Sequence, residues 1–185
     1  MEKIYYHIAS TLKALRKKKG WSLDKAALAT GVSKAMLGQI EREESSPTIA
    51  TLWKIATGFD TSFSSFIEDI QSEFNEPVYR TGQVQNIHPK DEKIRIFPLF
   101  PFENQLNFEL FIIELEPNCE HLSPPHNLGV IEHVIVIEGQ IEVFIDGLWQ
   151  KLVNGEGLRF NANQPHGYRN LTTKSAKFHD IIHYP

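Results

Sequence analysis

Apolar residues recur every three to four positions at the start of the chain, beginning with Ile4, Ile8, Leu12 and Leu15. This spacing is typical of amphipathic helices. Glycines and serines stop and start the pattern, because glycine ends helices and serine caps them. The pattern predicts helices over 4–18, 22–30 and 33–41, a fourth that starts at Pro47 and Thr48, and a short fifth around Phe66 and Ile67.

The period of the pattern changes from 3.6 to 2 beyond a polar segment, 71–90. Turn signals separate the apolar runs, and Ile145-Asp146-Gly147-Leu148 is typical of a two-residue hairpin. Many short strands at regular spacing are typical of a sandwich or a barrel. The predicted strands are 78–87, 94–98, 106–115, 131–138, 140–145, 148–152, 157–160, 166–171 and 176–184.

The two patterns predict an α+β chain with two domains. We expect a helical domain over 1–72, a linker over 73–90, and an all-β domain over 91–185. A length of 185 residues, with 41% hydrophobic and 23% charged residues, is ordinary for a globular protein of this size.

Charge is distributed unevenly between these two parts. Residues 1–59 carry ten Lys and Arg against five Asp and Glu, a net charge of +5, whereas the whole chain has a net charge of −4. The remainder therefore has a net charge of −9. A basic helical part on an acidic body suggests that only the helical part meets a polyanion.

The sequence also limits the compartment. Cys119 is the single cysteine, so no disulfide forms within one chain. The N-terminus has no apolar signal core, and no apolar run approaches the roughly 20 residues of a membrane span. We expect a cytoplasmic protein with no membrane partner.

The centre of the helical part is helix, tight turn, helix, in the segment LDKAALATGVSKAMLGQIERE over 23–43. One face of the second helix is apolar. The other face has short and polar side chains, which let a backbone approach DNA while Lys and Gln reach base edges. That face consists of Lys34, Ala35, Gly38, Gln39 and Arg42.

This region resembles the five-helix, phage-repressor-like helix-turn-helix domain of XRE-type regulators, over about residues 6–70. The resemblance rests on LKALRKKKGWSLDKAA, Gly31-Val32-Ser33, LGQIERE, the Ser-Pro-Thr at 46–48 and LWKIATGF. It implies an ion pair between Arg16 and Glu41. It also implies DNA-binding residues, with Ser33, Lys34, Ala35 and Gln39 at the major groove and Ser22, Lys25 and Arg42 on phosphates. Leu23 and Ala26 depart from the residues usual in the family.

The second domain contains His126-x5-Glu132-x6-Gly139, and later Gly155-Glu156-x3-Phe160-x4-Pro165-His166-x3-Asn170. Together they resemble the two motifs of the cupins, which fold as a double-stranded β-helix, or jelly-roll barrel. The common first motif has a second histidine where this chain has Leu128.

Strand alternation predicts that the polar motif residues converge. If Val134 and Val136 face the interior, Glu132 does too, and His166 and Tyr168 share a face of their strand. We expect an effector pocket of His126, Glu132, His166 and Tyr168. Two imidazoles and a carboxylate suit a divalent metal, either Zn, Fe, Ni or Mn. The alternative is a metal-free site whose polar groups bind an organic effector or each other.

The joint resemblance is to helix-turn-helix/cupin transcriptional regulators. It implies a homodimer that binds operator DNA, senses a small-molecule effector through the cupin and has no enzymatic activity. One alternative is an iron-dependent oxygenase, similar to the epoxidases that carry a helix-turn-helix domain. Another is a protein-interaction module, which would leave the basic helical part unexplained. We interpret His133 as packed outside the barrel, Arg159 as an exposed strand residue, and His121, His179 and His183 as having no part in the site.

Overall fold

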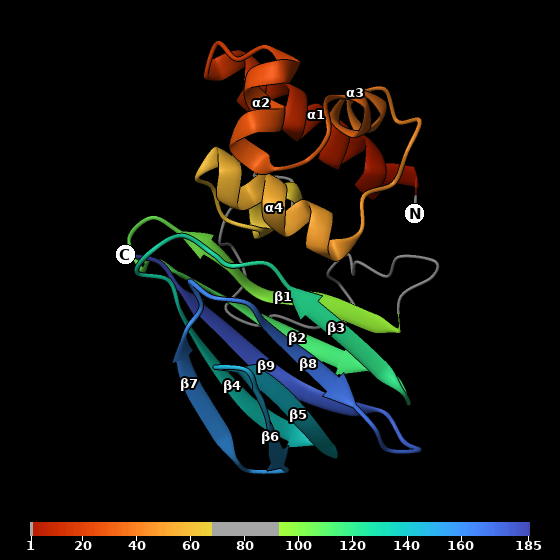
Figure 1. Cartoon of the computed structure of the whole chain (residues 1–185), viewed down its shortest axis with the longest axis vertical. Coiled ribbons are helices and arrows are strands. Elements are labelled where there is room, and N and C mark those ends of the chain that lie inside the picture. Colours follow the sequence, from red (N-terminus) through yellow and green to blue (C-terminus); the bar gives the residue numbers. More distant parts are fainter. Residues whose placement is uncertain (1, 68–92) are drawn as a thin grey trace, which may run out of the picture. The chain divides into compact units, whose positions relative to one another are not determined.

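The computed structural model describes residues 2–67 and 93–185, which belong to two compact units, Met1–Pro77 and Val78–Pro185. The predicted linker, 73–90, and the predicted strand over 78–87 lie outside the described residues, so the domain limits stay predictions. The described residues confirm the α+β layout, with helices in the first unit and strands in the second (Figure 1). None of the described helices has both the length and the apolar character that crossing a membrane requires.

The first unit contains α1 (Glu2–Lys18), α2 (Leu23–Thr30), α3 (Lys34–Glu41), α4 (Ile49–Phe59) and the 3-10 turn η1 (Ser64–Phe66). Serine or threonine caps three of these helices, as the sequence predicts: Ser22, Ser33 and Thr48 each accept a backbone N–H three residues later. The core consists of the apolar faces of the helices, including Leu12, Leu37, Ile40, Leu52, Ile55 and Phe59.

The prediction of five helices is wrong for the described residues, which contain four α-helices and one 3-10 turn. Serine side chains compete with helical hydrogen bonding there. The Ser65 hydroxyl donates to the Ser62 carbonyl at 2.6 Å, and the Ser62 and Ser65 hydroxyls lie 2.8 Å apart. Phe63 and Phe66 are fully buried, and Phe63 stacks on Trp53 at 4.2 Å. Burial, rather than helical periodicity, sets the conformation of this segment.

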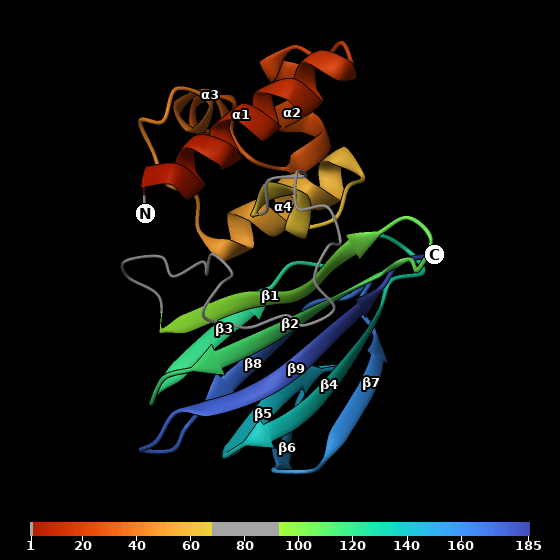
Figure 2. The ribbon, with the colours of Figure 1, turned by 180° about the vertical axis from the view of Figure 1, so that it is seen from behind.

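The second unit consists of two antiparallel sheets. The strands are β1 (Ile94–Glu103), β2 (Phe108–Leu115), β3 (Cys119–Ser123), β4 (Ile131–Glu138), β5 (Gln140–Ile145), β6 (Leu148–Val153), β7 (Gly157–Asn161), β8 (His166–Asn170) and β9 (Ala176–His183). One sheet has the order β1-β2-β9-β4-β7, which Figure 2 shows from its own side, and the other has the order β3-β8-β5-β6. Inward residues of both sheets form the core.

Strand β3 was not predicted, because its residues invert the usual alternation. Leu122 is 55% exposed, whereas Cys119 and Ser123 are buried. Pairing with β8 sets the strand, with Cys119 opposite Asn170 and Ser123 opposite His166. A polar residue that faces inward gives no periodic signal, so only the partner strand identifies β3.

The prolines in β1 explain why that strand was predicted too short. The sequence predicts its end at Pro98, but pairing with β2 continues to Glu103 through register shifts after Pro98 and Phe100. β1 is an edge strand, where the missing N–H of proline breaks no second ladder. The predicted hairpin between β5 and β6 is confirmed, with positive φ at both Asp146 and Gly147 and Ile145 opposite Leu148.

Candidate functional site

The turn between α2 and α3 presents one side of α3 to solvent. Gly31 ends α2 in the left-handed region, with φ of 65°, and Ser33 caps α3. Leu37 and Ile40 are buried. All seven residues predicted to bind DNA are exposed: Ser22, Lys25, Ser33, Lys34, Ala35, Gln39 and Arg42. Their contacts with DNA stay a prediction.

Gly38 differs from its predicted place on the DNA-facing side of α3. It is buried, and a Cβ at this position would lie 3.1 Å from Nη1 of Arg42 and 3.7 Å from Cδ1 of Leu23. The missing side chain therefore makes room for the Arg42 guanidinium beside the helix. The exposed surface of α3 consists of the other four predicted residues.

The ion pair implied between Arg16 and Glu41 is present, and it connects α1 to α3. Arg16 Nε donates to Glu41 Oε1 at 2.5 Å and Nη2 donates to Oε2 at 2.7 Å, while Nη1 donates to the Trp21 carbonyl at 3.0 Å. Both side chains are largely buried. This bidentate contact fixes the orientation of α3 relative to α1.

A buried polar cluster forms the second candidate site, in the interior of the β unit. Glu132 on β4 lies at its centre and is 1% exposed. His126 Nε2 donates to Glu132 Oε1 at 2.8 Å, and the Tyr168 hydroxyl on β8 donates to Oε2. His166 Nε2 lies 3.3 Å from Oε1. The structure thus brings together the four residues of the predicted pocket.

The His166 ring is held in an orientation that suits a ligand. Its Nδ1 lies 2.9 Å from the Gln164 carbonyl oxygen, so a proton on Nδ1 donates there and Nε2 faces Glu132. Although buried, Nε2 has no partner in hydrogen-bond alignment among the described residues. One ligand atom from each of His126, Glu132 and His166 lies within 4.8 Å of the others. These observations show that the three residues fit a divalent metal ion.

Burial and charge act against each other at these groups. Burial acts to raise the pKa of Glu132, but the charges of His166 and His126 and the polar contacts with both rings together lower the pKa. Burial acts to lower the pKa of His166, but the Glu132 charge, the polar contact with Glu132 and the Gln164 carbonyl together raise the pKa. Burial, together with the charges of Asp180 and Glu132, raises the pKa of Tyr168.

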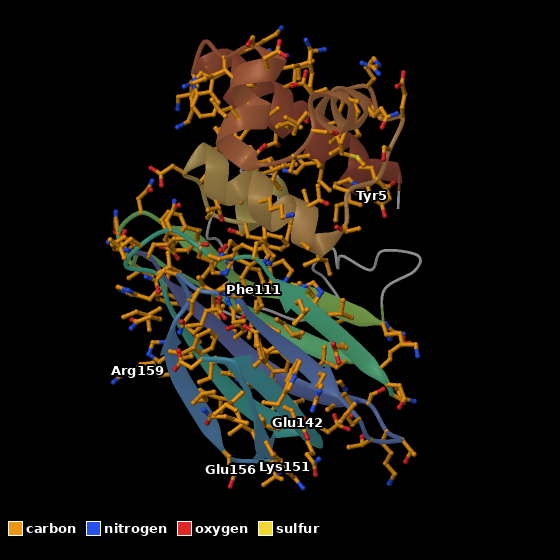
Figure 3. All side chains as sticks on the ribbon, viewed as in Figure 1. Tyr5, Phe111, Glu142, Lys151, Glu156 and Arg159 are labelled. Atoms are coloured by element: carbon orange, nitrogen blue, oxygen red, sulfur yellow. The ribbon has the colours of Figure 1, made fainter. Side chains whose placement is uncertain are left out.

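Leu128, which replaces the second motif histidine, is 82% exposed and lies outside the cluster. His133 and Arg159 are opposite each other on the outer face of β4 and β7, as predicted. Figure 3 shows Arg159 at the outer side of β7. Asn170 has a structural role, because its amide donates to the carbonyls of Leu115 and Lys174.

Sequence reasoning missed three inward groups. His121 shares a face of β3 with Cys119 and Ser123, and burial, followed by the His166 charge, lowers its pKa to about 4. Glu109 and Asp180 are buried on β2 and β9. Asp180 alternates inward with Phe178 and Ile182, so strand alternation was the signal that could have identified it.

Asp180→Asn is expected to gain stability relative to the native chain as pH rises above about 4. Burial, followed by the charges of Glu132 and Glu109, raises the folded-state pKa of Asp180 well above its usual value. The native carboxyl therefore stabilises the fold fully below its unfolded-state pKa, and this contribution is lost as pH rises through the folded-state pKa. Urea unfolding of both chains from pH 4 to 9 measures the difference.

The control for this prediction is Glu114→Gln, on the outer face of the same sheet. This variant removes a carboxyl that lies outside the buried acidic group, and it is measured over the same pH range. A constant difference between Asp180→Asn and the native chain would contradict the prediction.

Comparison with known proteins identifies both domains. Residues 12–66 match the helix-turn-helix family HTH_3, and residues 111–182 match the cupin domain family Cupin_2. The chain is 50% identical to the HTH-type transcriptional regulator SutR of Escherichia coli K12, over 100% of this chain and 99% of the relative.

Solved structures that are similar to this chain include a full-length regulator and a single cupin domain. A crystal structure of an HTH_3 family transcriptional regulator from Vibrio cholerae has 47% identity and a TM-score of 0.86, and the similarity covers 99% of this chain and 98% of the other. The Cupin_2 domain of an XRE family transcriptional regulator from Enterobacter cloacae has 45% identity and a TM-score of 0.50, over 51% of this chain and 99% of the other.

Proposed function

The chain belongs to the family of helix-turn-helix transcriptional regulators that carry a cupin domain, and from this premise we propose that its cupin senses a small-molecule effector and thereby modulates operator binding. One observation carries the proposal. The same chain presents an exposed recognition helix, α3, in one compact unit and a buried, convergent His126/Glu132/His166 group in the other. As a partner of chromosomal DNA, the protein is expected to work in the cytoplasm.

We propose that the operator-binding form is a homodimer. One helix-turn-helix module buries too little surface for tight and selective binding, whereas a two-fold dimer contacts two half-sites about 34 Å apart. Ile135 and Ile137 on the outer face of β4 are each 39% exposed, and they are the proposed centre of the dimer contact. An effector would need to change the dimer arrangement by only about 1–3 kcal/mol to alter DNA occupancy 5- to 150-fold.

We also propose that His126, Glu132 and His166 hold a divalent metal ion, either Zn, Fe, Ni or Mn. Three protein ligands leave a coordination position open, so the bound ion would supply a Lewis-acid contact for an oxygen or nitrogen donor. Neighbouring residues orient two of the three ligand side chains. Gln164 orients His166, and Tyr168 occupies the second oxygen of Glu132.

The oxygenase alternative is not favoured, since the full-length relatives with 50% and 47% identity are named as transcriptional regulators. The chain is a regulator rather than an enzyme. Oxygen uptake by the iron-loaded protein that is lost in Glu132→Ala would contradict this conclusion.

The test of the proposed function is binding of the full chain to DNA from upstream of its own gene and to random DNA, across a salt series. We expect selective binding whose affinity falls steeply with salt, because each cation that contacts a phosphate releases counterions. A metabolite and metal panel then tests the cupin. Failure of every cupin ligand to alter DNA affinity would count against effector sensing.

Gln39→Ala and Arg42→Ala are expected to differ in which DNA they affect. Gln39 is exposed on α3, and an amide is suited to a base edge, so its loss should reduce discrimination between upstream and random DNA by about 1–3 kcal/mol. Arg42→Ala should weaken both DNAs equally and reduce the salt slope by up to about 1. Fluorescence anisotropy on both DNAs measures this, and equal effects of the two changes would refute the assignment.

A further inference from the structure

Lys34, a predicted DNA contact at the start of α3, is paired with a carboxylate within the protein. Its Nζ donates to Oδ2 of Asp24 at 2.8 Å, across the turn between α2 and α3. The Lys34 and Asp24 side chains are 60% and 71% exposed. A DNA phosphate or base edge that reaches Lys34 would therefore meet Asp24 at the same place.

Arg42, a predicted phosphate contact at the end of α3, is paired in the same way. Its Nε donates to Oε1 of Glu44 at 2.8 Å and its Nη2 donates to Oε2 at 2.7 Å. The two side chains are 59% and 52% exposed. This bidentate geometry is also the one with which arginine binds a phosphate, so Glu44 occupies donors that DNA would use.

The pairing accounts for most of the acidic residues of the helical part. Residues 1–59 contain five of them: Glu2, Asp24, Glu41, Glu43 and Glu44. Glu41 binds Arg16 in the interior, and Asp24 and Glu44 bind the two cations at the ends of α3. Glu43 is exposed and takes part in no ion pair among the described residues. Asp24 and Glu44 thus form ion pairs with the DNA-facing cations, whereas the neighbouring Glu43 does not.

We propose that Asp24 and Glu44 are determinants of DNA affinity, because each forms an ion pair with a DNA-facing cation, and DNA must break this ion pair to bind the cation. The inference rests on the proposed DNA-binding role of α3 and extends it to two acidic residues that do not themselves bind DNA. In the free protein they neutralise Lys34 and Arg42. In the complex the two carboxylates lose their partners and lie close to the phosphates.

The expected size of the effect follows from the exposure of both pairs. An exposed ion pair contributes a factor of about 1.4 to 5 to an equilibrium constant. Two pairs together would weaken DNA binding by about 2- to 25-fold, which overlaps the range of about 5- to 150-fold by which an effector typically changes affinity. The two acidic residues would thereby lower the operator affinity to a level at which effector binding can change DNA occupancy.

The salt dependence of DNA affinity provides a second measure of the competition between the carboxylates and DNA. When DNA displaces Asp24 from Lys34, the freed carboxylate attracts cations from solution, and this offsets the counterions released by the phosphate. Removing the carboxylate should steepen the slope of log affinity against log salt by up to about 0.9 for each pair.

The experiment uses the full chain and a mixed-sequence 30-base-pair duplex, which requires no knowledge of the operator. Asp24→Asn and Glu44→Gln are compared with Glu43→Gln, which changes the net charge equally without breaking an ion pair. We expect each of the first two variants to bind about 1.4- to 5-fold more tightly than Glu43→Gln, with steeper salt slopes.

A double-mutant cycle tests whether each carboxylate acts through its cation. Asp24→Asn should have no effect beyond that of Glu43→Gln in a Lys34→Ala background, and the same holds for Glu44→Gln in an Arg42→Ala background. The inference would be overturned if the two variants bind DNA no more tightly than Glu43→Gln. It would also be overturned if an effect larger than that of Glu43→Gln persists after the cation is removed. If the native chain shows no salt-dependent DNA binding, the result would instead overturn the proposed function.

Discussion

Glu132→Ala is expected to lower the free energy of unfolding of the cupin unit by about 3–5 kcal/mol, the cost of removing one partner of a buried charged contact. Glu132 receives a hydrogen bond from His126 and another from the Tyr168 hydroxyl, and it lies 3.3 Å from His166. Alanine leaves these groups buried without the carboxylate. It also leaves a cavity in the interior.

Urea unfolding followed by circular dichroism of the β-sheet signal measures the loss, and metal analysis of the purified chains measures the ligand role. Glu132→Gln keeps an acceptor oxygen and should lose less stability, although it too should bind less metal. Glu138→Gln is the surface control, because the Glu138 side chain is 62% exposed in its pair with Lys177, and the change should alter stability by less than about 1 kcal/mol.

The Glu132 effect should also depend on pH. The folded-state pKa of Glu132 is below its usual value, so its charged form stabilises the fold above about pH 4. That contribution is lost as pH falls through the folded-state pKa, and the difference between Glu132→Gln and the native chain should shrink in acid. Unchanged stability with unchanged metal content in Glu132→Ala would contradict the assigned role of this residue.

Arg16→Ala should lower both the stability of the helical unit and its affinity for DNA. The stability loss is expected to be about 1.5–3 kcal/mol, typical of hydrogen bonds to charged groups. Arg16 makes two hydrogen bonds to Glu41 and one to the Trp21 carbonyl, and its loss leaves the largely buried Glu41 carboxylate without this cation. Because α3 is then no longer held against α1, the recognition surface should become less ordered and bind DNA more weakly.

Thermal unfolding and DNA anisotropy of the same preparations test this prediction. Arg42→Ala is the control, because its ion pair with Glu44 is exposed and should contribute little to stability. It should weaken DNA binding without unfolding the helical unit. Arg16→Lys retains the charge but not the planar fork, so it should lie between the native chain and Arg16→Ala. Equal stability of Arg16→Ala and the native chain would contradict the prediction.

Local features of this protein were predictable from sequence because they depend on neighbouring residues. The caps at Ser22 and Ser33, the glycine turn at Gly31 and the hairpin at Asp146-Gly147 need only a few adjacent positions. Strand alternation placed Glu132, His166 and Tyr168 on inward faces by the same logic, since side chains alternate with a period of two.

The family resemblance supplied what periodicity could not, namely the Arg16–Glu41 pair and the motif that includes His126. Arg16 and Glu41 are 25 positions apart, and no local rule connects them. The short 3-10 turn at Ser64–Phe66 shows the converse, because burial of Phe63 and Phe66 and hydrogen bonding between serines replaced the helix that spacing predicted.

Strand register determined which other polar residues meet in the interior of the β unit. Glu109 and Glu132 both lie opposite Ile182, and Asp180 lies opposite Phe111 and Val134, so three carboxylates from separate strands share one inner face. His121 faces inward because β3 pairs with β8, and Lys34 meets Asp24 because the turn folds α3 back beside α2. The sequence by itself determined four helices, most of the strands, the helix caps and the inward residues of regular strands. The tertiary structure alone decided which distant charges meet, because that depends on register and packing between segments that are far apart in the chain.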